Sequence, residues 1–145
     1  MRGNNDYSGS LYIGSEQRQV KMIYDTASQW VVVNNENIGA ELISNYDVKE
    51  STTAVAKYTD SSENTPRLID LDYGTVDFEG IVYTDNMCLY QTRNTRTLSS
   101  GRMCVRNMPF VSVSKIIGEF EYNGVIGLAP NTKNGAYVNQ LFMQD

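Results

Sequence analysis

The chain has no histidine among its 145 residues, and it has only two cysteines and three prolines. Without histidine, neither a Ser-His-Asp nor a Cys-His catalytic arrangement can form, and most catalytic zinc sites are excluded. Two cysteines without histidine do not make a metal site, and we expect no cofactor. Any catalysis therefore depends on carboxylates, hydroxyls, the cysteines or backbone dipoles.

Positive charge is also scarce, because 12 Lys and Arg stand against 17 Asp and Glu, for a net charge of -5. A protein that follows nucleic-acid phosphates needs a basic face, so we expect no nucleic-acid partner. No apolar run approaches the roughly 18 residues of a membrane span, so we expect no membrane partner. The start of the chain has no apolar segment typical of a signal peptide, so any leader would lie outside it.

The length predicts one domain, at roughly 150 residues per domain, and the main pattern is that of β-strands. Alternating polar and apolar residues predict half-buried strands over 20–24, 68–73 and 76–83. Two runs, Trp30–Val33 and Val125–Ala129, are apolar throughout and predict strands buried on both faces. The expected fold class is therefore all-β.

The end of the chain is the one segment with a helical pattern. Val138, Leu141 and Phe142 share one helix face, after a break at Asn134-Gly135. Turn and loop residues occur at Ser8-Gly9, at Gly14-Ser15 and over 59–64, a polar stretch expected to be an exposed loop.

The two cysteines, Cys88 and Cys104, flank a polar segment centred near Arg96. In an antiparallel hairpin that turns there, the two would face each other, and a disulfide would contribute roughly 3 kcal/mol. A disulfide favours an oxidising compartment, whereas two separate buried thiols would suit a cytosolic protein.

An acid follows an apolar strand at Asp25, within Met22-Ile23-Tyr24-Asp25-Thr26-Ala27-Ser28. Such a turn can hold a carboxylate among backbone N–H and hydroxyl donors. By itself, Asp-Thr-Ala-Ser is also a common pattern for a turn or a helix cap.

Several ordered segments resemble the amino-terminal lobe of pepsin-like aspartic proteases. Asp25–Ser28 stands where the family has Asp-Thr-Gly-Ser, and Tyr73-Gly74-Thr75 is similar to the flap hairpin. Asn123–Ala129 looks like the family's Asp-Gly-Ile-Leu-Gly-Leu-Ala motif. The other similar segments are Tyr7–Gly14, Trp30–Val32 and Tyr46–Thr53. The resemblance covers nearly the whole chain, and the cysteine pair is similar to that of some protist members.

The resemblance implies an all-β lobe of curved, packed antiparallel sheets with a flap hairpin and a short C-terminal helix. It implies an aspartic endopeptidase in which two aspartates, one per lobe, activate a water between them. Asp25 would be the catalytic acid of this lobe. Thr26 would help to join the two lobes' loops, and Ser28 would hydrogen-bond near the acids.

The resemblance also assigns the substrate-binding residues. Tyr73 would close over a peptide or protein substrate with its hydroxyl near Trp30, and Gly74 and Thr75 would offer backbone contacts. The expected pocket walls are Ile23, Tyr122 and Val125. The resemblance also implies that the protein enters the secretory pathway and is located in a lysosome or vacuole, or outside the cell.

Two departures from the family pattern bear on activity. No second Asp-Thr/Ser-Gly is present, and Asp60-Ser61-Ser62 is the nearest imitation. Residues 1–145 therefore correspond to the amino-terminal lobe alone, without the carboxy-terminal lobe, and we expect no hydrolysis by the isolated chain. Ala27 also replaces the family's Gly, and its methyl group adds bulk beside the catalytic acids.

Three alternatives remain open from the sequence. One is a catalytically silent relative that binds extended peptides. Another is a homodimeric single-lobe protease, in which a second copy supplies the other Asp25. The third is an unrelated secreted β domain, in which Asp25 and Tyr73 would lie far apart.

Overall fold

A computed structural model describes residues 6–35, 46–59, 62–91, 103–130 and 136–144. Its elements are β1 (Ser8–Ile13), β2 (Arg18–Asp25), β3 (Val31–Asn34), the 3-10 helix η1 (Val48–Glu50), β4 (Val55–Ala56), β5 (Tyr58–Thr59), β6 (Ser62–Pro66), β7 (Leu68–Asp72), β8 (Val76–Cys88), β9 (Cys104–Gly118), β10 (Gly124–Gly127) and α1 (Tyr137–Met143). The all-β prediction with a short C-terminal helix is confirmed.

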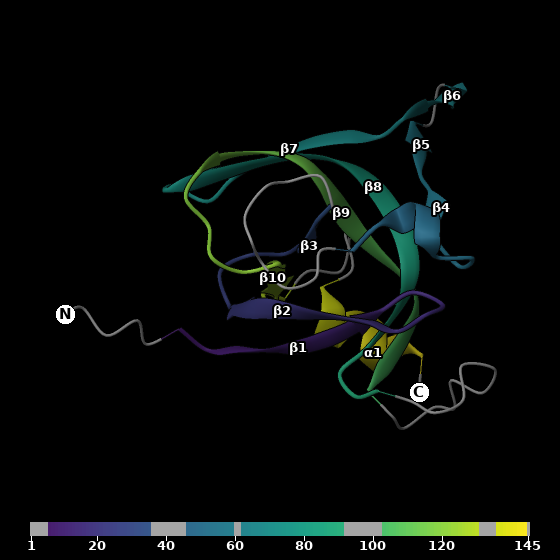
Figure 1. The fold of residues 1–145 in the computed structure, drawn as a ribbon, viewed down its shortest axis with the longest axis horizontal. Coiled ribbons are helices and arrows are strands. Elements are labelled where there is room, and N and C mark those ends of the chain that lie inside the picture. Colours follow the sequence, from purple (N-terminus) through teal and green to yellow (C-terminus); the bar gives the residue numbers. More distant parts are fainter. Residues whose placement is uncertain (1–5, 36–45, 60–61, 92–102, 131–135, 145) are drawn as a thin grey trace.

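One mixed sheet forms most of the protein (Figure 1). Its strand order is β1-β2-β10-β3-β9-β8-β4, with β7 paired to β8. A further pairing of Tyr12 in β1 with Cys88 in β8 joins the first strand back to the far side of the sheet, so the sheet curls and closes on itself. Two pairings, β10 with β2 and β3 with β9, are parallel, and the others are antiparallel.

The curled sheet has two apolar cores, which explain the two fully apolar runs of the sequence. Along β3, Val31 and Val33 face one core while Val32 faces the other. Along β10, Ile126 joins the first core and Val125 joins the second. Because successive side chains of a strand point to opposite faces, a strand between two cores is apolar at every position.

The predicted disulfide joins Cys88 to Cys104, which are direct partners across β8 and β9. It lies at the end of two long strands, and the expected turn near Arg96 falls outside the described residues. The break at Asn134-Gly135 is also outside them. No helix in the described part of the chain is long and apolar enough to cross a membrane.

The predicted helix is present, and of the three residues that share its apolar face only Leu141 packs against a core. Val138 and Phe142 are 51% and 84% exposed, whereas Tyr137 is 2% exposed. The Tyr137 hydroxyl donates to the backbone oxygens of Met87 (3.2 Å) and Met103 (2.7 Å). A ring that reaches two strand ends therefore sets the rotation of α1.

Two predictions of irregular structure were also wrong. The polar stretch over 59–64 contains the start of β6, which pairs with β5 in a small two-stranded sheet. Ser8-Gly9 belongs to β1 and is not a turn. A Cβ at Gly9 would lie 2.5 Å from the Tyr24 hydroxyl oxygen, so the absence of a side chain at this position lets the Tyr24 ring pack closely against β1. Gly14, with φ of 80°, begins the predicted turn after β1.

Candidate active site

Asp25 is the last residue of β2, and the neighbouring strand holds it in place. β10 runs parallel to β2 and pairs Gly127 with Asp25. The Leu128 N–H donates to the Asp25 backbone oxygen at 2.8 Å. The acid is half-buried, and its side chain forms no ion pair with any described residue.

The turn after Asp25 is fastened to the same strand. The Ala27 N–H donates to Asp25 Oδ1 at 2.9 Å, and the Ala129 N–H donates to the Ser28 backbone oxygen at 2.9 Å. A Cβ at Gly127 would lie 2.6 Å from the Trp30 backbone oxygen and 2.7 Å from that of Ser28. Only glycine permits this close approach, which links the Asn123–Ala129 motif to the geometry of the acid.

The residues beside Asp25 differ in exposure. Thr26 and Ala27 are exposed, and Ala27 has a negative φ that any residue adopts without strain. The Ser28 hydroxyl oxygen is buried, and no described residue hydrogen-bonds to it. Ser28 is nevertheless near enough to the Tyr73 hydroxyl to lower the pKa of that group.

The predicted flap is the hairpin of β7 and β8, which pair from Leu68–Ile81 to Asp72–Asp77. At its tip, the Tyr73 N–H donates to the Val76 oxygen (3.0 Å), and the Gly74 N–H donates to Asp72 Oδ1 (2.7 Å). Gly74 has φ of 80°, in the left-handed region that favours glycine. The tip lies on the side of the molecule toward which β2 ends (Figure 1).

The flap tyrosine rests on the second core. Its ring packs edge-on against Phe78 at 5.3 Å between centroids, and Phe78 packs likewise against Phe120 at 5.1 Å. Burial, followed by the negative charge of Asp25, raises the pKa of Tyr73, while Ser28 lowers it. The Tyr73 hydroxyl therefore lies near Asp25 and Ser28, and Tyr73 lines one hollow together with Trp30.

Two surface hollows meet at Asp25 and Tyr73. The first, of about 390 Å³, is walled by Ile23, Tyr122 and Val125, and Thr75 also lines it. The second, of about 420 Å³, is lined by Asp25, Ala27, Ser28, Gln29, Trp30, Leu71, Asp72 and Tyr73. The fold thus brings the expected acid, the flap tyrosine and the three expected pocket walls to one cleft.

Sequence reasoning missed several residues of this cleft. Asp6, Val76, Glu119, Phe120 and Glu121 line the first hollow, and Leu71 and Asp72 line the second. The alternation of 68–73 and 76–83 indicated the strands that carry Leu71, Asp72 and Val76. No signal pointed to Asp6 or to 119–121, which reach the cleft only through the path of the chain before β1 and after β9.

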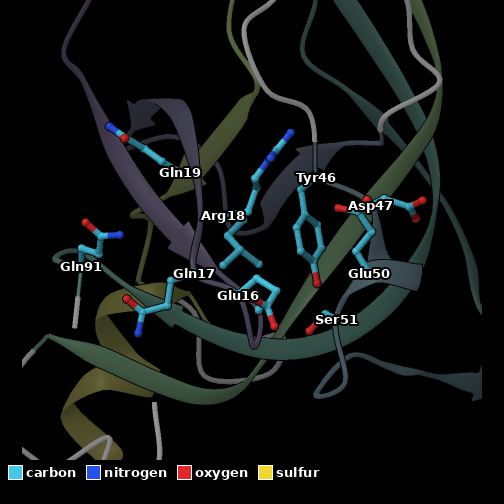
Figure 2. A pocket seen from close by; sticks show the side chains of 11 residues that line it. Glu16, Gln17, Arg18, Gln19, Tyr46, Asp47, Glu50, Ser51 and Gln91 are labelled. Atoms are coloured by element: carbon cyan, nitrogen blue, oxygen red, sulfur yellow. The ribbon is translucent and has the colours of Figure 1, made fainter. Parts of the chain in front are cut away.

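A third hollow, of about 470 Å³, lies at the opposite end of β2, around the turn between β1 and β2. Figure 2 shows Glu16, Arg18, Tyr46 and Glu50 around it. Asp25 is seven residues along β2 from Arg18, roughly 23 Å at the rise of a strand. This hollow is therefore separate from the cleft that contains the candidate catalytic acid.

Comparison with known proteins gives one family. A family model described as eukaryotic aspartyl protease matches residues 6–144. A search of curated proteins finds no match.

Proposed function

The chain belongs to the eukaryotic aspartyl protease family, and from this we propose that it supplies one catalytic aspartate, Asp25, and the flap of an aspartic endopeptidase. The observation that carries the proposal is the shared cleft. Asp25 and Tyr73 line both hollows, and Ile23, Tyr122 and Val125 wall one of them. An unrelated β domain would have no reason to gather these five residues.

The proposed chemistry needs a second carboxylate. Two carboxyl groups a few ångströms apart share one proton, because like charges at that distance are not both ionised. The ionised member takes a proton from the water between them, and the protonated member polarises the scissile carbonyl. A proton then passes to the leaving amine. The two groups titrate as a pair, so neither apparent pKa belongs to one residue.

The partner carboxylate would come from a carboxy-terminal lobe, with residues 1–145 forming the amino-terminal lobe. Thr26 and Ala27 are exposed beside Asp25, where the loop of a second lobe would meet them. On this proposal the isolated chain binds peptide but hydrolyses none, since it holds only half of the catalytic pair.

Substrate would bind as an extended strand between the flap and Asp25, through main-chain hydrogen bonds and side-chain pockets. The exposed tip at Gly74 and Thr75 offers backbone groups to such a strand. The two hollows on either side of Asp25 would receive side chains from either side of the scissile bond.

We also propose an oxidising location, in the secretory pathway, a lysosome or vacuole, or outside the cell. The Cys88–Cys104 disulfide supports this, because such bonds persist in oxidising compartments and are rare in the cytosol.

The test compares the chain alone with the protein encoded by its full gene. We expect pepstatin-sensitive cleavage of an unfolded protein substrate by the two-lobed form, and none after Asp25→Asn. Purified residues 1–145 should sediment as a monomer and cleave nothing. Activity of the chain alone that falls on dilution would instead indicate the homodimeric protease, with Asp25 from each copy.

One observation favours a second candidate, a silent relative that binds peptides without cutting them. Ala27 stands where the family has Gly, and it is exposed and lines the second hollow together with the acid. The same experiment separates the two candidates. Peptide binding that persists without cleavage in the two-lobed protein would identify the silent relative.

A further inference from the structure

The charged side chains that line the two hollows of the cleft are all acidic. Besides Asp25, the first hollow is lined by Asp6, Glu119 and Glu121, and the second is lined by Asp72. No Lys or Arg of the described residues lines either hollow. A cleft lined by charges of one sign concentrates its field on whatever binds there.

Two basic groups lie near the cleft, and neither forms an ion pair with these acids among the described residues. Lys21 Nζ lies 5.4 Å from the centre of the Tyr122 ring, and the Arg67 guanidinium lies 5.8 Å from that of Trp30. The ion pair found among the described residues joins Lys115 to Glu79, neither of which lines the cleft. Asp6, Glu119 and Glu121 therefore form no ion pair with any described residue.

The first hollow also has an aromatic and aliphatic wall. Phe120 and Tyr122 lie 5.9 Å apart between ring centroids, and Ile23 and Val125 complete the apolar surface near Asp25. Burial first, and then the charges of Asp6 and Glu121, raise the pKa of the Tyr122 hydroxyl. Asp6 and Glu121 therefore lie near the Tyr122 hydroxyl, and Glu119 lines the same hollow.

We propose that the hollow walled by Ile23, Phe120, Tyr122 and Val125 selects a lysine or arginine side chain of the substrate, which Asp6, Glu119 and Glu121 bind at its charged end. This deepens the proposed function and rests on it. The methylene stem of Lys or Arg would pack on the rings, while the cation would reach the carboxylates.

The same arrangement discriminates against other side chains. A Glu or Asp side chain of the substrate in this hollow would be repelled by the three carboxylates, which carry the same charge. An aliphatic side chain of equal length would keep the ring contacts and gain nothing from the carboxylates. The three acids are exposed, so each pair with a substrate cation is weak alone, and the preference depends on their acting together.

The test measures binding rather than cleavage, so that it does not depend on catalysis. Short peptides with a reduced, uncleavable amide bond would carry Lys, norleucine or Glu at each position flanking that bond. The protein encoded by the full gene is titrated near neutral pH. Displacement of a fluorescent peptide gives the affinity, and in residues 1–145 the sole tryptophan, Trp30 in the cleft wall, reports binding directly.

At one of these positions, we expect the Lys peptide to bind about fivefold more tightly than norleucine, as two or three partly exposed ion pairs would give. The Glu peptide should bind most weakly. Raising the salt concentration should remove the advantage of Lys and leave norleucine affinity unchanged, because exposed charges are screened.

The variant Glu119→Gln with Glu121→Gln should remove most of this preference. The matched control is Glu16→Gln with Glu50→Gln, which changes the net charge equally at the distant hollow of Figure 2 and should preserve it. An equal loss in both variants would mean that only net charge matters, and would overturn the proposal.

Failure of this inference is distinguishable from failure of the proposed function. Cleavage that depends on Asp25, with no preference for Lys at any position, overturns the inference alone. A Lys preference in binding, without any cleavage, supports the inference and contradicts the endopeptidase. Failure of every peptide to bind would overturn the inference outright.

Discussion

At the scale of single residues, Asp85 shows how one buried carboxylate can hold distant segments of the chain together. It is fully buried, and it accepts hydrogen bonds from the Tyr46 hydroxyl, from Thr53 Oγ1 (2.5 Å) and from the Asn86 N–H (2.7 Å). These donors come from three separate parts of the chain. Asp85 thus joins the segment before η1 and the segment after it to the long strand β8.

We predict that Asp85→Asn lowers the free energy of unfolding by about 2 kcal/mol. An amide loses the charge-assisted hydrogen bonds and turns an N–H₂ group toward groups that donate. Urea unfolding followed by circular dichroism measures the change. The control is Asp70→Asn on the exposed side of β7, which should stay within about 0.5 kcal/mol of the parent. Equal stability of the two variants would contradict the assigned role.

Ala27 is the second informative residue, since its φ is negative and its methyl group is exposed in this lobe. We predict that Ala27→Gly lowers the free energy of unfolding by about 0.4–1 kcal/mol, because glycine makes the unfolded chain freer. The hydrogen bond from residue 27 to Asp25 uses the backbone and should persist.

In the two-lobed protein, cleavage by the Ala27→Gly variant should proceed at the parent's rate. A clear rise in rate would show that the methyl group obstructs the opposite loop or the water. The initial rate of peptide hydrolysis measures this.

At the scale of elements, α1 is held through one ring. Tyr137 is buried and donates to the backbones of Met87 and Met103, beside the disulfide-linked strand ends. Burial, followed by the charge of Tyr24, raises its pKa above the ordinary 10.0. A raised pKa means that the folded state holds the phenol proton more tightly than the unfolded state does.

The stabilisation by Tyr137 is therefore complete below pH 10 and is lost as the pH rises above it. Tyr137→Phe should lower the free energy of unfolding by about 1–2 kcal/mol at neutral pH, because it removes the hydroxyl proton shared between the Met87 and Met103 backbone oxygens. Above pH 10, the free energy of unfolding of the Tyr137→Phe variant should fall less steeply with pH than that of the parent. Tyr58→Phe, in the partly exposed strand β5, is the control and should follow the parent curve. Denaturant midpoints measured across this range decide the matter.

Individual elements also show which predictions a sequence supports. The alternation in 68–73 and 76–83 predicted the two strands that pair as β7 and β8, because the period of burial along a strand is a local property of the sequence. The flap itself was predicted from the resemblance of Tyr73-Gly74-Thr75 to the family. The sequence pattern did not indicate that Val138 and Phe142 would be exposed, because the buried ring of Tyr137 determines which side of α1 faces the sheet. The pairing of β5 with β6 was missed because the stretch is polar, and its stability comes from backbone pairing.

At the scale of the whole molecule, the disulfide stabilises the folded protein because it restricts the conformations of the unfolded chain. Cys88 and Cys104 are 16 residues apart and bridge the ends of β8 and β9, the two longest strands described. We predict that Cys88→Ala with Cys104→Ala lowers the free energy of unfolding by roughly 3 kcal/mol.

Urea unfolding of the double variant and of the oxidised parent provides the measurement. Reducing agent should bring the parent to a similar midpoint and leave the variant unchanged. If neither reduction of the parent nor replacement of both cysteines changes the urea midpoint, the disulfide has no stabilising role.

The sequence by itself determined which strands are buried on both faces, which residues alternate and which acid ends an apolar strand. These follow from local patterns, since burial repeats with the period of the strand. The tertiary structure alone decided that Asp6, Glu119 and Glu121 line one hollow with Tyr122, and that Tyr73 lies near Asp25 and Ser28. Such neighbours lie far apart along the chain, and only the curling of the sheet brings them to one cleft.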